Sequence, residues 1–178
     1  MTEREVLIGL ERGGVRLVPH DPEWARIYEG ERARIEAAIG VHVLDIQHVG
    51  STSIPGIAAK PIVDIAIGVE SYEGARVCIA PLEALGYTYH GEHGIPGRHY
   101  FTRGDPTLYH VHMHEVTSRA WGNLVLFRDY ILAHPKEAQA YLELKQRMAE
   151  RHRRDRRAYT DGKAAFIERI LELARSSV

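Results

Sequence analysis

The stretch between Gln47 and Val69 constrains the fold of this chain more strongly than any other part of the sequence. One apolar run ends at Val49, small residues follow at positions 50–53, and a second apolar run begins after Lys60 and carries one carboxylate, Asp64. Glycine and proline between two apolar runs are typical of a strand, a tight turn, a short crossover and a second strand. We therefore expect these two strands to lie at the centre of a sheet.

The turn at positions 50–53 has the chemistry of a phosphate-binding turn. Glycine lets the backbone approach a ligand closely, and the hydroxyl and N–H groups that follow can donate hydrogen bonds to phosphate oxygens. The candidate phosphate-binding residues are Gly50, Ser51, Thr52 and Ser53. The simpler alternative is a glycine-serine turn that only connects two buried strands.

The second strand, expected at Pro61 to Val69, presents two different faces. Alternation places the larger apolar residues on one face, and places Asp64 on the other face among mainly small residues. A carboxylate with space beside it suits Mg²⁺ or Mn²⁺ carrying substrate phosphates, because Mg²⁺ takes only one or two protein carboxylates. The alternative role of Asp64 is that of a hydrogen-bonded strand residue.

The sequence YHVHMHEV, at residues 109–116, predicts a second candidate metal site. Alternation places His110, His112 and His114 on one face of a strand. Residues four apart on a strand are separated by about 13 Å, so at most one neighbouring pair can share an ion. Zn²⁺ held by His110 and His112 would need a third ligand, such as Asp64 or His99. Alternatively, these histidines form the polar face of a half-buried strand that lines the same cleft.

Four further residues are candidates for holding a phosphate or a base. Lys60 precedes the Asp64 strand, and Arg128 lies in a helical stretch where its alternative is a surface ion pair. Tyr159 and Lys163 are four residues apart and share one face if a single helix contains both. In that case Tyr159 could stack on a base while Lys163 holds a phosphate, or the two could simply pack together.

The remaining elements are predicted from periodicity, caps and breakers. Asp21 is expected to cap a helix that begins at Pro22 and ends at Gly40. The other predicted helices cover residues 71–85 with a break at Pro81, 120–133, 135–152 and 161–174, and the other strands cover 15–18, 41–49, 87–90, 98–103 and 108–116. The layout is a single α/β (α+β) domain, residues 1–178, with a mixed sheet and a helical C-terminal section.

Composition excludes some classes of partner. The net charge of −1 gives no electrostatic case for nucleic acid, and the arginine-rich run at 151–157 is interpreted as a solvated face. No stretch approaches 18 continuous apolar residues, so no membrane association is expected. The single cysteine, Cys78, is expected to be buried and suits a reducing compartment, so a cytoplasmic location is expected. The oligomeric state is left open.

Three stretches resemble a known family. HVGSTSIPGIAAKPIVDI (48–65), LFRDYILAHP (126–135) and DRRAYTDGKAAFI (155–167) resemble the GrpB family, and the first also resembles the nucleotidyltransferase fold of the DNA polymerase beta superfamily. The resemblance implies a nucleotidyltransferase-type mixed sheet flanked by helices. It also implies that the 50–51 turn positions a triphosphate, that Asp64 holds the metal, and that Lys60 stabilises charge on pyrophosphate.

The sequence departs from the superfamily pattern at two places. Ala66 stands where an active nucleotidyltransferase carries its second acid, and His110 or His112 stands near the place of the third. Three functions therefore stay open. They are metal-dependent nucleotidyl transfer, an inactive nucleotide- or phosphometabolite-binding or assisting module linked to coenzyme A metabolism, and a histidine-based metal-dependent hydrolase. The coenzyme A link rests on the resemblance, because GrpB-like domains are found joined to dephospho-CoA kinase.

Overall fold

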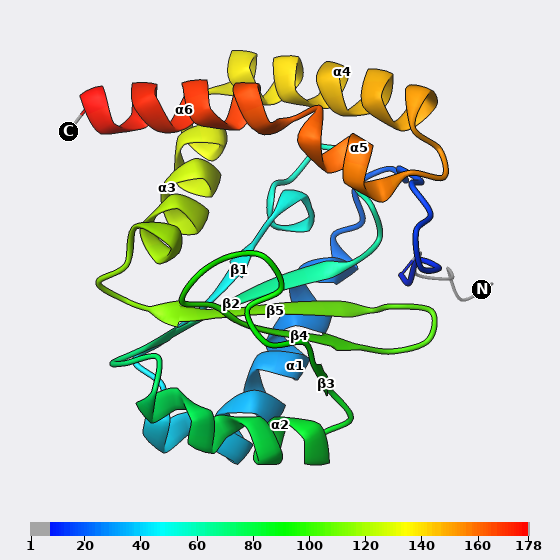
Figure 1. The fold of residues 1–178 in the computed structure, drawn as a ribbon. Helices are drawn as coiled ribbons and strands as arrows, with labels where there is room; N and C mark the ends of the chain where they lie inside the picture. Colours follow the sequence, from blue (N-terminus) through cyan, green and yellow to red (C-terminus); the bar gives the residue numbers. More distant parts are fainter. Residues whose placement is uncertain (1–7, 178) are drawn as a thin grey trace.

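The computed structural model describes residues 8–177. The helices are α1 (Glu23–Ile39), α2 (Ile79–Ala84), α3 (Arg119–Ala133), α4 (Pro135–Arg151), α5 (Arg156–Asp161) and α6 (Ala164–Ser176). The strands are β1 (Asp45–Val49), β2 (Val63–Val69), β3 (Thr88–Tyr89), β4 (His99–Arg103) and β5 (Tyr109–Glu115). Helices α1 and α2 cover one face of the sheet, and α3 to α6 lie on its other side (Figure 1). The predicted mixed α/β class with a helical C-terminal section is confirmed.

The five strands form one mixed sheet in the order β1-β2-β5-β4-β3. Only β2 and β5 pair in parallel, and the other neighbours are antiparallel, including the predicted hairpin of β4 and β5. The parallel register aligns Asp64 with His110 and Ala66 with His112. Because side chains alternate along each strand, Asp64, His110 and His112 emerge on the same face of the sheet.

The main hydrophobic core lies between the sheet and the helices α1 and α2. The predicted alternation is confirmed, because Val63, Ile65 and Ile67 of β2 are fully buried in this core. Their neighbours on β4 and β5 are Phe101, Tyr109, Val111 and Met113. Cys78 is buried here as a free thiol, as predicted.

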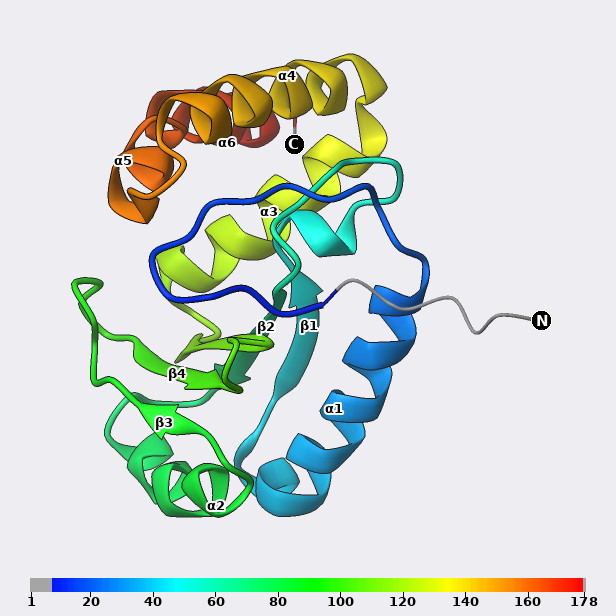
Figure 2. The ribbon, with the colours of Figure 1, turned by 90° about the vertical axis from the view of Figure 1, so that its right-hand side faces the viewer.

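The opposite face of the sheet packs on α3 at one end only. Trp121 of α3 contacts Val49 and Ala66, while a separate cluster joins Tyr141 of α4 and Ile170 of α6. That second cluster also takes in the connection that follows the 50–53 turn, through Ile54 and Ile57. The C-terminal helices are therefore held above the sheet by α3 and by this connection (Figure 2).

The first helix begins at Glu23, one residue after its predicted start at Pro22. The Asp21 carboxylate accepts a hydrogen bond from the Glu23 N–H at 3.1 Å, and Pro22 has helical dihedral angles. Trp24, in the first turn, is completely buried. The helix ends at Ile39, directly before Gly40.

Two predicted elements are wrong. Residues 15–18 form no strand, because the segment makes only one bridge, between Val18 and Ala59. The helix predicted over 71–85 is a 3-10 turn at Gly74–Cys78 followed by the short helix α2. Pro81 does not break α2 because it lies in the first turn, where its missing N–H has no helical partner to lose.

The other differences concern where elements begin and end. The first strand starts at Asp45 because residues 40–42 form a 3-10 turn. The helix predicted over 161–174 is preceded by the separate helix α5, which begins where the Asp155 carboxylate accepts from the Ala158 N–H at 2.9 Å. None of the helices within residues 8–177 is long and apolar enough to cross a membrane.

Candidate functional site

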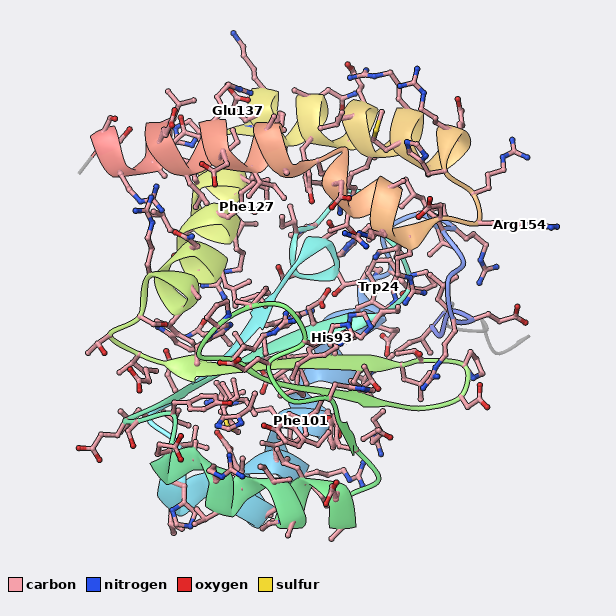
Figure 3. All side chains as sticks on the ribbon, viewed as in Figure 1. Trp24, His93, Phe101, Phe127, Glu137 and Arg154 are labelled. Carbon is pink, nitrogen blue, oxygen red and sulfur yellow. The ribbon has the colours of Figure 1, made fainter. Side chains whose placement is uncertain are left out.

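A cavity of about 310 Å³ lies between the middle of the sheet and the C-terminal helices. In Figure 3, Phe101 lies on the α1 and α2 side of the sheet, whereas Phe127 projects from α3 toward the helices on the cavity side. The volume falls in the lower part of the range of about 300–1,000 Å³ that is usual for small-molecule sites. The lining residues are Val49, Gly50, Ser51, Thr52, Lys60, Ile62, Asp64, His110, His112, Leu124, Tyr141, Tyr159, Thr160 and Lys163.

Asp64, His110 and His112 form one group on the floor of the cavity. The Asp64 Oδ1 atom lies 3.4 Å from His110 Nδ1 and 3.1 Å from His112 Nε2. One ligand atom from each residue lies within 4.8 Å of the other two, so the three can surround a single metal ion. Asp64 is therefore the third member that the histidine pair required, and the structure brings the three predicted metal ligands together.

The other histidines near this strand lie elsewhere. His99 is buried between Tyr72 and Tyr89, with Nε2 at 2.8 Å from the Tyr72 carbonyl and Nδ1 at 2.7 Å from the Tyr89 hydroxyl. His114 is buried and does not line the cavity, and its burial lowers its pKa to about 4. Neither residue can complete the group at Asp64.

The floor of the cavity favours an ionised carboxylate and a neutral imidazole. Burial by itself would raise the pKa of Asp64, but the hydrogen bonds from His110 and His112 outweigh it and lower that pKa. Burial lowers the pKa of His110, and the neighbouring Asp64 only partly opposes this effect. A carboxylate beside a neutral imidazole is the protonation state in which both groups bind metal.

Arg98 touches the far side of His112. Its Nη1 atom donates to His112 Nδ1 at 3.3 Å, and its other nitrogens donate to the carbonyls of Glu92 and His93. Because Nδ1 accepts this bond, His112 carries its proton on Nε2 and donates it to Asp64 at 3.1 Å. For a metal to bind at Nε2, this proton would have to move to Nδ1, which faces the Arg98 guanidinium, so Arg98 influences how readily His112 becomes a ligand.

The 50–53 turn lies directly against Asp64. Gly50 has φ +70°, and a Cβ atom there would lie 2.5 Å from Asp64 Oδ2, so only glycine fits. Ser51 lines the cavity and hydrogen-bonds to Tyr141. Thr52 also reaches the cavity, but its hydroxyl is paired with His48 Nε2 at 2.9 Å.

Two predicted phosphate-binding residues are absent from the cavity wall. The Ser53 hydroxyl donates to the Gly50 carbonyl and so closes the turn. The Arg128 guanidinium donates to Gln47 Oε1 at 2.8 Å and to the His48 carbonyl at 2.9 Å, which fastens α3 to β1. The expected cleft position of Ser53 and Arg128 is therefore not observed, because backbone and side-chain acceptors already occupy their donors.

Lys60, Tyr159 and Lys163 meet on the wall opposite the floor group. The Lys60 ammonium lies 5.2 Å and the Lys163 ammonium 4.3 Å from the centre of the Tyr159 ring. Tyr159 belongs to α5 and Lys163 directly precedes α6, so the predicted pair forms even though one helix does not contain both. Burial lowers the pKa of each lysine to about 8.

Sequence reasoning missed Tyr141, Arg98 and Lys145. Tyr141 lines the cavity from α4, and Lys145, one turn further along, is buried and donates to the Ala58 carbonyl. The only signal for Lys145 in the sequence is its spacing of four from Tyr141, which marks a shared helix face. No motif surrounds Arg98, and only the fold of the 91–97 loop brings it to His112.

The fold and the candidate site together define the class of protein to which this chain belongs. It comprises mixed α/β proteins in which one carboxylate, two imidazoles and two lysines converge on a cavity above the sheet. The chain belongs to the GrpB family, whose model, described as "GrpB protein", matches residues 14–173.

Some known proteins similar to this chain are about twice as long as the part that matches, and another matches over almost its whole length. The Bacillus subtilis protein called "UPF0157 protein YqkA" is 39% identical over 90% of the chain, which spans about half (47%) of that relative. A Mycolicibacterium paratuberculosis protein called "Dephospho-CoA kinase" is 33% identical over 84% of the chain and 43% of its own length. The crystal structure of GrpB from Enterococcus faecalis superposes with a TM-score of 0.84, at 31% identity, over 91% of this chain and 98% of that one.

Proposed function

We propose that this protein binds a nucleotide or phosphorylated metabolite in the cavity, with one divalent metal ion held by Asp64, His110 and His112. The observation that carries the proposal is the convergence of these three side chains within 4.8 Å. The same cavity is lined by Gly50, Ser51 and two lysines. Phosphate oxygens can bind a metal and ammonium groups at the same time, so this set of groups suits a phosphorylated ligand.

The donor set favours a first-row transition metal. Two imidazoles and one carboxylate are typical ligands of Zn²⁺ or Fe²⁺, and can also hold Mn²⁺, whereas Mg²⁺ prefers oxygen ligands. A second metal of the two-metal type does not fit these residues. Ala66, opposite His112 in the sheet, is fully buried against Val49 and Trp121 and offers no ligand atom. The proposed reaction chemistry is therefore limited to a single ion.

The residues around the group have separable tasks. The metal would supply Lewis acidity at a phosphate oxygen. Asp64 provides the anionic ligand, and the close approach of Gly50 keeps its carboxylate in place. Lys60 and Lys163 neutralise phosphate charge, and the Ser51 hydroxyl, held by Tyr141, is available at the turn.

The test is to titrate the metal-stripped protein with Zn²⁺ and with Mn²⁺ by calorimetry, followed by ATP and dephospho-CoA as probes. We expect one ion per chain and stronger phosphate binding when it is present. Asp64→Asn and His112→Ala should weaken metal binding by at least about 10-fold, since loss of a ligand exceeds the 10–100-fold effect of supporting residues. His42→Ala is the matched control because His42 is exposed and does not line the cavity.

The result that contradicts the proposal is equally definite. If Asp64→Asn binds metal as tightly as the unchanged protein, Asp64, His110 and His112 are not a metal site. If neither probe binds with or without metal, the cavity is not a phosphate site.

A link to coenzyme A metabolism is the second candidate. It is supported by the relative named dephospho-CoA kinase, of which the matching part forms less than half. In that case the chain would bind dephospho-CoA or a related phosphorylated metabolite and assist another protein without turnover. Metal-dependent nucleotidyl transfer or hydrolysis remains a proposal on the same site, and release of pyrophosphate or phosphate that requires Asp64 would establish it.

A further inference from the structure

In the described part of the chain, the two lysines of the cavity form no direct ion pair, although the charge of Asp64 acts on both and raises their pKa. Lys60 precedes β2 and Lys163 precedes α6, yet both ammonium groups contact the ring of Tyr159. Within residues 8–177, neither ammonium forms a hydrogen bond or an ion pair with a carboxylate. The one acidic residue of the lining, Asp64, is bonded to His110 and His112.

Among the described residues, the positive charges of Lys60 and Lys163 are not neutralised by a nearby negative group in direct contact. Both lysines are partly buried, and each keeps most of its charge at pH 7 because its pKa is about 8. Lys60 and Lys163 repel each other, and burial removes part of their hydration. A ligand that brings two closely spaced negative centres would offset both effects, whereas a single negative centre would offset them only in part.

The two tyrosines that line the cavity, Tyr141 and Tyr159, are buried by contacts with other side chains. Tyr159 is 1% exposed and its ring carries both ammonium contacts. Tyr141 is buried, with its ring stacked on Phe166 at 5.3 Å and in contact with the Lys145 ammonium. Neither ring offers an exposed face for a base, so the structure favours the alternative for Tyr159, which is packing against Lys163.

We propose that the cavity recognises a diphosphate group, which Lys60 and Lys163 hold from the wall beside Tyr159, and that any base or other organic part of the ligand lies outside it. This inference rests on the proposed function, and it narrows the ligand class from phosphorylated compounds in general to diphosphates. The volume of about 310 Å³ suits a compact anion of this kind.

The test measures affinities of the protein, with saturating Mn²⁺, for pyrophosphate, ADP, AMP, inorganic phosphate and adenosine. We expect pyrophosphate and ADP to bind with similar affinity, both at least about 10-fold tighter than AMP and phosphate, because a second charge-assisted contact adds roughly that factor. Adenosine should not bind. Lys60→Met and Lys163→Met should each weaken pyrophosphate binding by about 10-fold.

The exposed Lys136, on α4, provides the control, and Lys136→Met should leave all affinities unchanged. Equal affinity for phosphate and pyrophosphate, or binding of ADP without pyrophosphate, would overturn the diphosphate inference while the proposed phosphate function stands. Absence of binding by every anion would overturn both. If a lysine variant fails to fold, the ligand series on the unchanged protein still decides the question.

Discussion

Asp64 is the residue that contacts most of the other polar groups on the floor of the cavity. It accepts a hydrogen bond from His112, it lies 3.4 Å from His110 Nδ1 and against Gly50, and it is the acidic member of the lining. Its pKa is lowered because the interactions with His110 and His112 outweigh the effect of burial. The chain of contacts continues from His112 to Arg98, a buried cation that donates to the ring nitrogen facing away from Asp64.

Arg98→Gln should strengthen metal binding. A ligating histidine normally donates its other ring N–H to an acceptor, and the glutamine carbonyl can accept that proton where the guanidinium cannot. Removing a cation near the ion acts in the same direction. We expect an increase in Zn²⁺ affinity of about 10-fold, measured by competition with a chelator.

Arg98→Lys is the matched control, because it keeps the positive charge and has no acceptor. If Arg98→Gln binds Zn²⁺ no better than Arg98→Lys, then Arg98 does not act through His112.

At the scale of elements, the site depends on the parallel pairing of β2 and β5 and on the turn that follows β1. The pairing places Asp64 beside His110, and the turn returns the chain so that Gly50 covers the carboxylate. Helix α3 contributes Leu124 to the lining of the cavity, while Arg128 fastens the same helix to β1. The turn is therefore coupled to the candidate metal ligands Asp64, His110 and His112 through the contact of Gly50 with Asp64.

Gly50→Ala should disturb the metal group as well as the backbone. Alanine at φ +70° is strained by about 1–3 kcal/mol, and its Cβ would displace the Asp64 carboxylate. Gly56→Ala is the control, because Gly56 has φ +82° with nothing within 4 Å of the added atom. We expect both variants to lose stability in urea titrations.

Only Gly50→Ala should also lose metal affinity, by about 10-fold or more. Equal metal affinity in the two variants would show that the close approach of Gly50 does not position Asp64.

At the scale of the whole molecule, three buried or partly buried lysines lie between the sheet and the C-terminal helices. Burial lowers the pKa of Lys60 and Lys163 to about 8, and it also lowers the pKa of Lys145 well below its usual value. Lys145 is 1% exposed and contacts Tyr141, which connects this group of charges to the hydrophobic cluster of α4 and α6.

The free energy of unfolding should therefore rise between pH 7 and pH 9. Below the usual lysine pKa of about 10.4, the unfolded chain binds more protons at these positions than the folded chain does, so stability increases with pH. Lys145→Met should reduce this increase, because it removes a group whose pKa is lowered by burial on folding.

Urea denaturation at several pH values measures the effect, with the exposed Lys136→Met on the same helix as the control. If the stability of Lys145→Met depends on pH in the same way as that of the control, Lys145 does not contribute to the rise in stability with pH.

The sequence by itself determined the local features of this protein. Period-two alternation placed Asp64 on one face of its strand and Val63, Ile65 and Ile67 on the other, and it separated His110 and His112 from the core face of theirs. The 50–53 turn and the Asp21 start of α1 were also readable. These features depend on dihedral preferences and on side-chain spacing within a few residues, which a sequence contains directly.

Only the tertiary structure decided which of these features meet. The register that sets Asp64 beside His110 joins strands that are far apart in the chain, and Lys60 and Lys163 meet at Tyr159 because α5 and α6 fold back over the sheet. Arg128 had the right helical setting for a cleft residue, yet its guanidinium is taken up by acceptors on β1. Such contacts depend on which faces of the helices and the sheet pack against each other. The spacing of residues within one segment does not specify that packing.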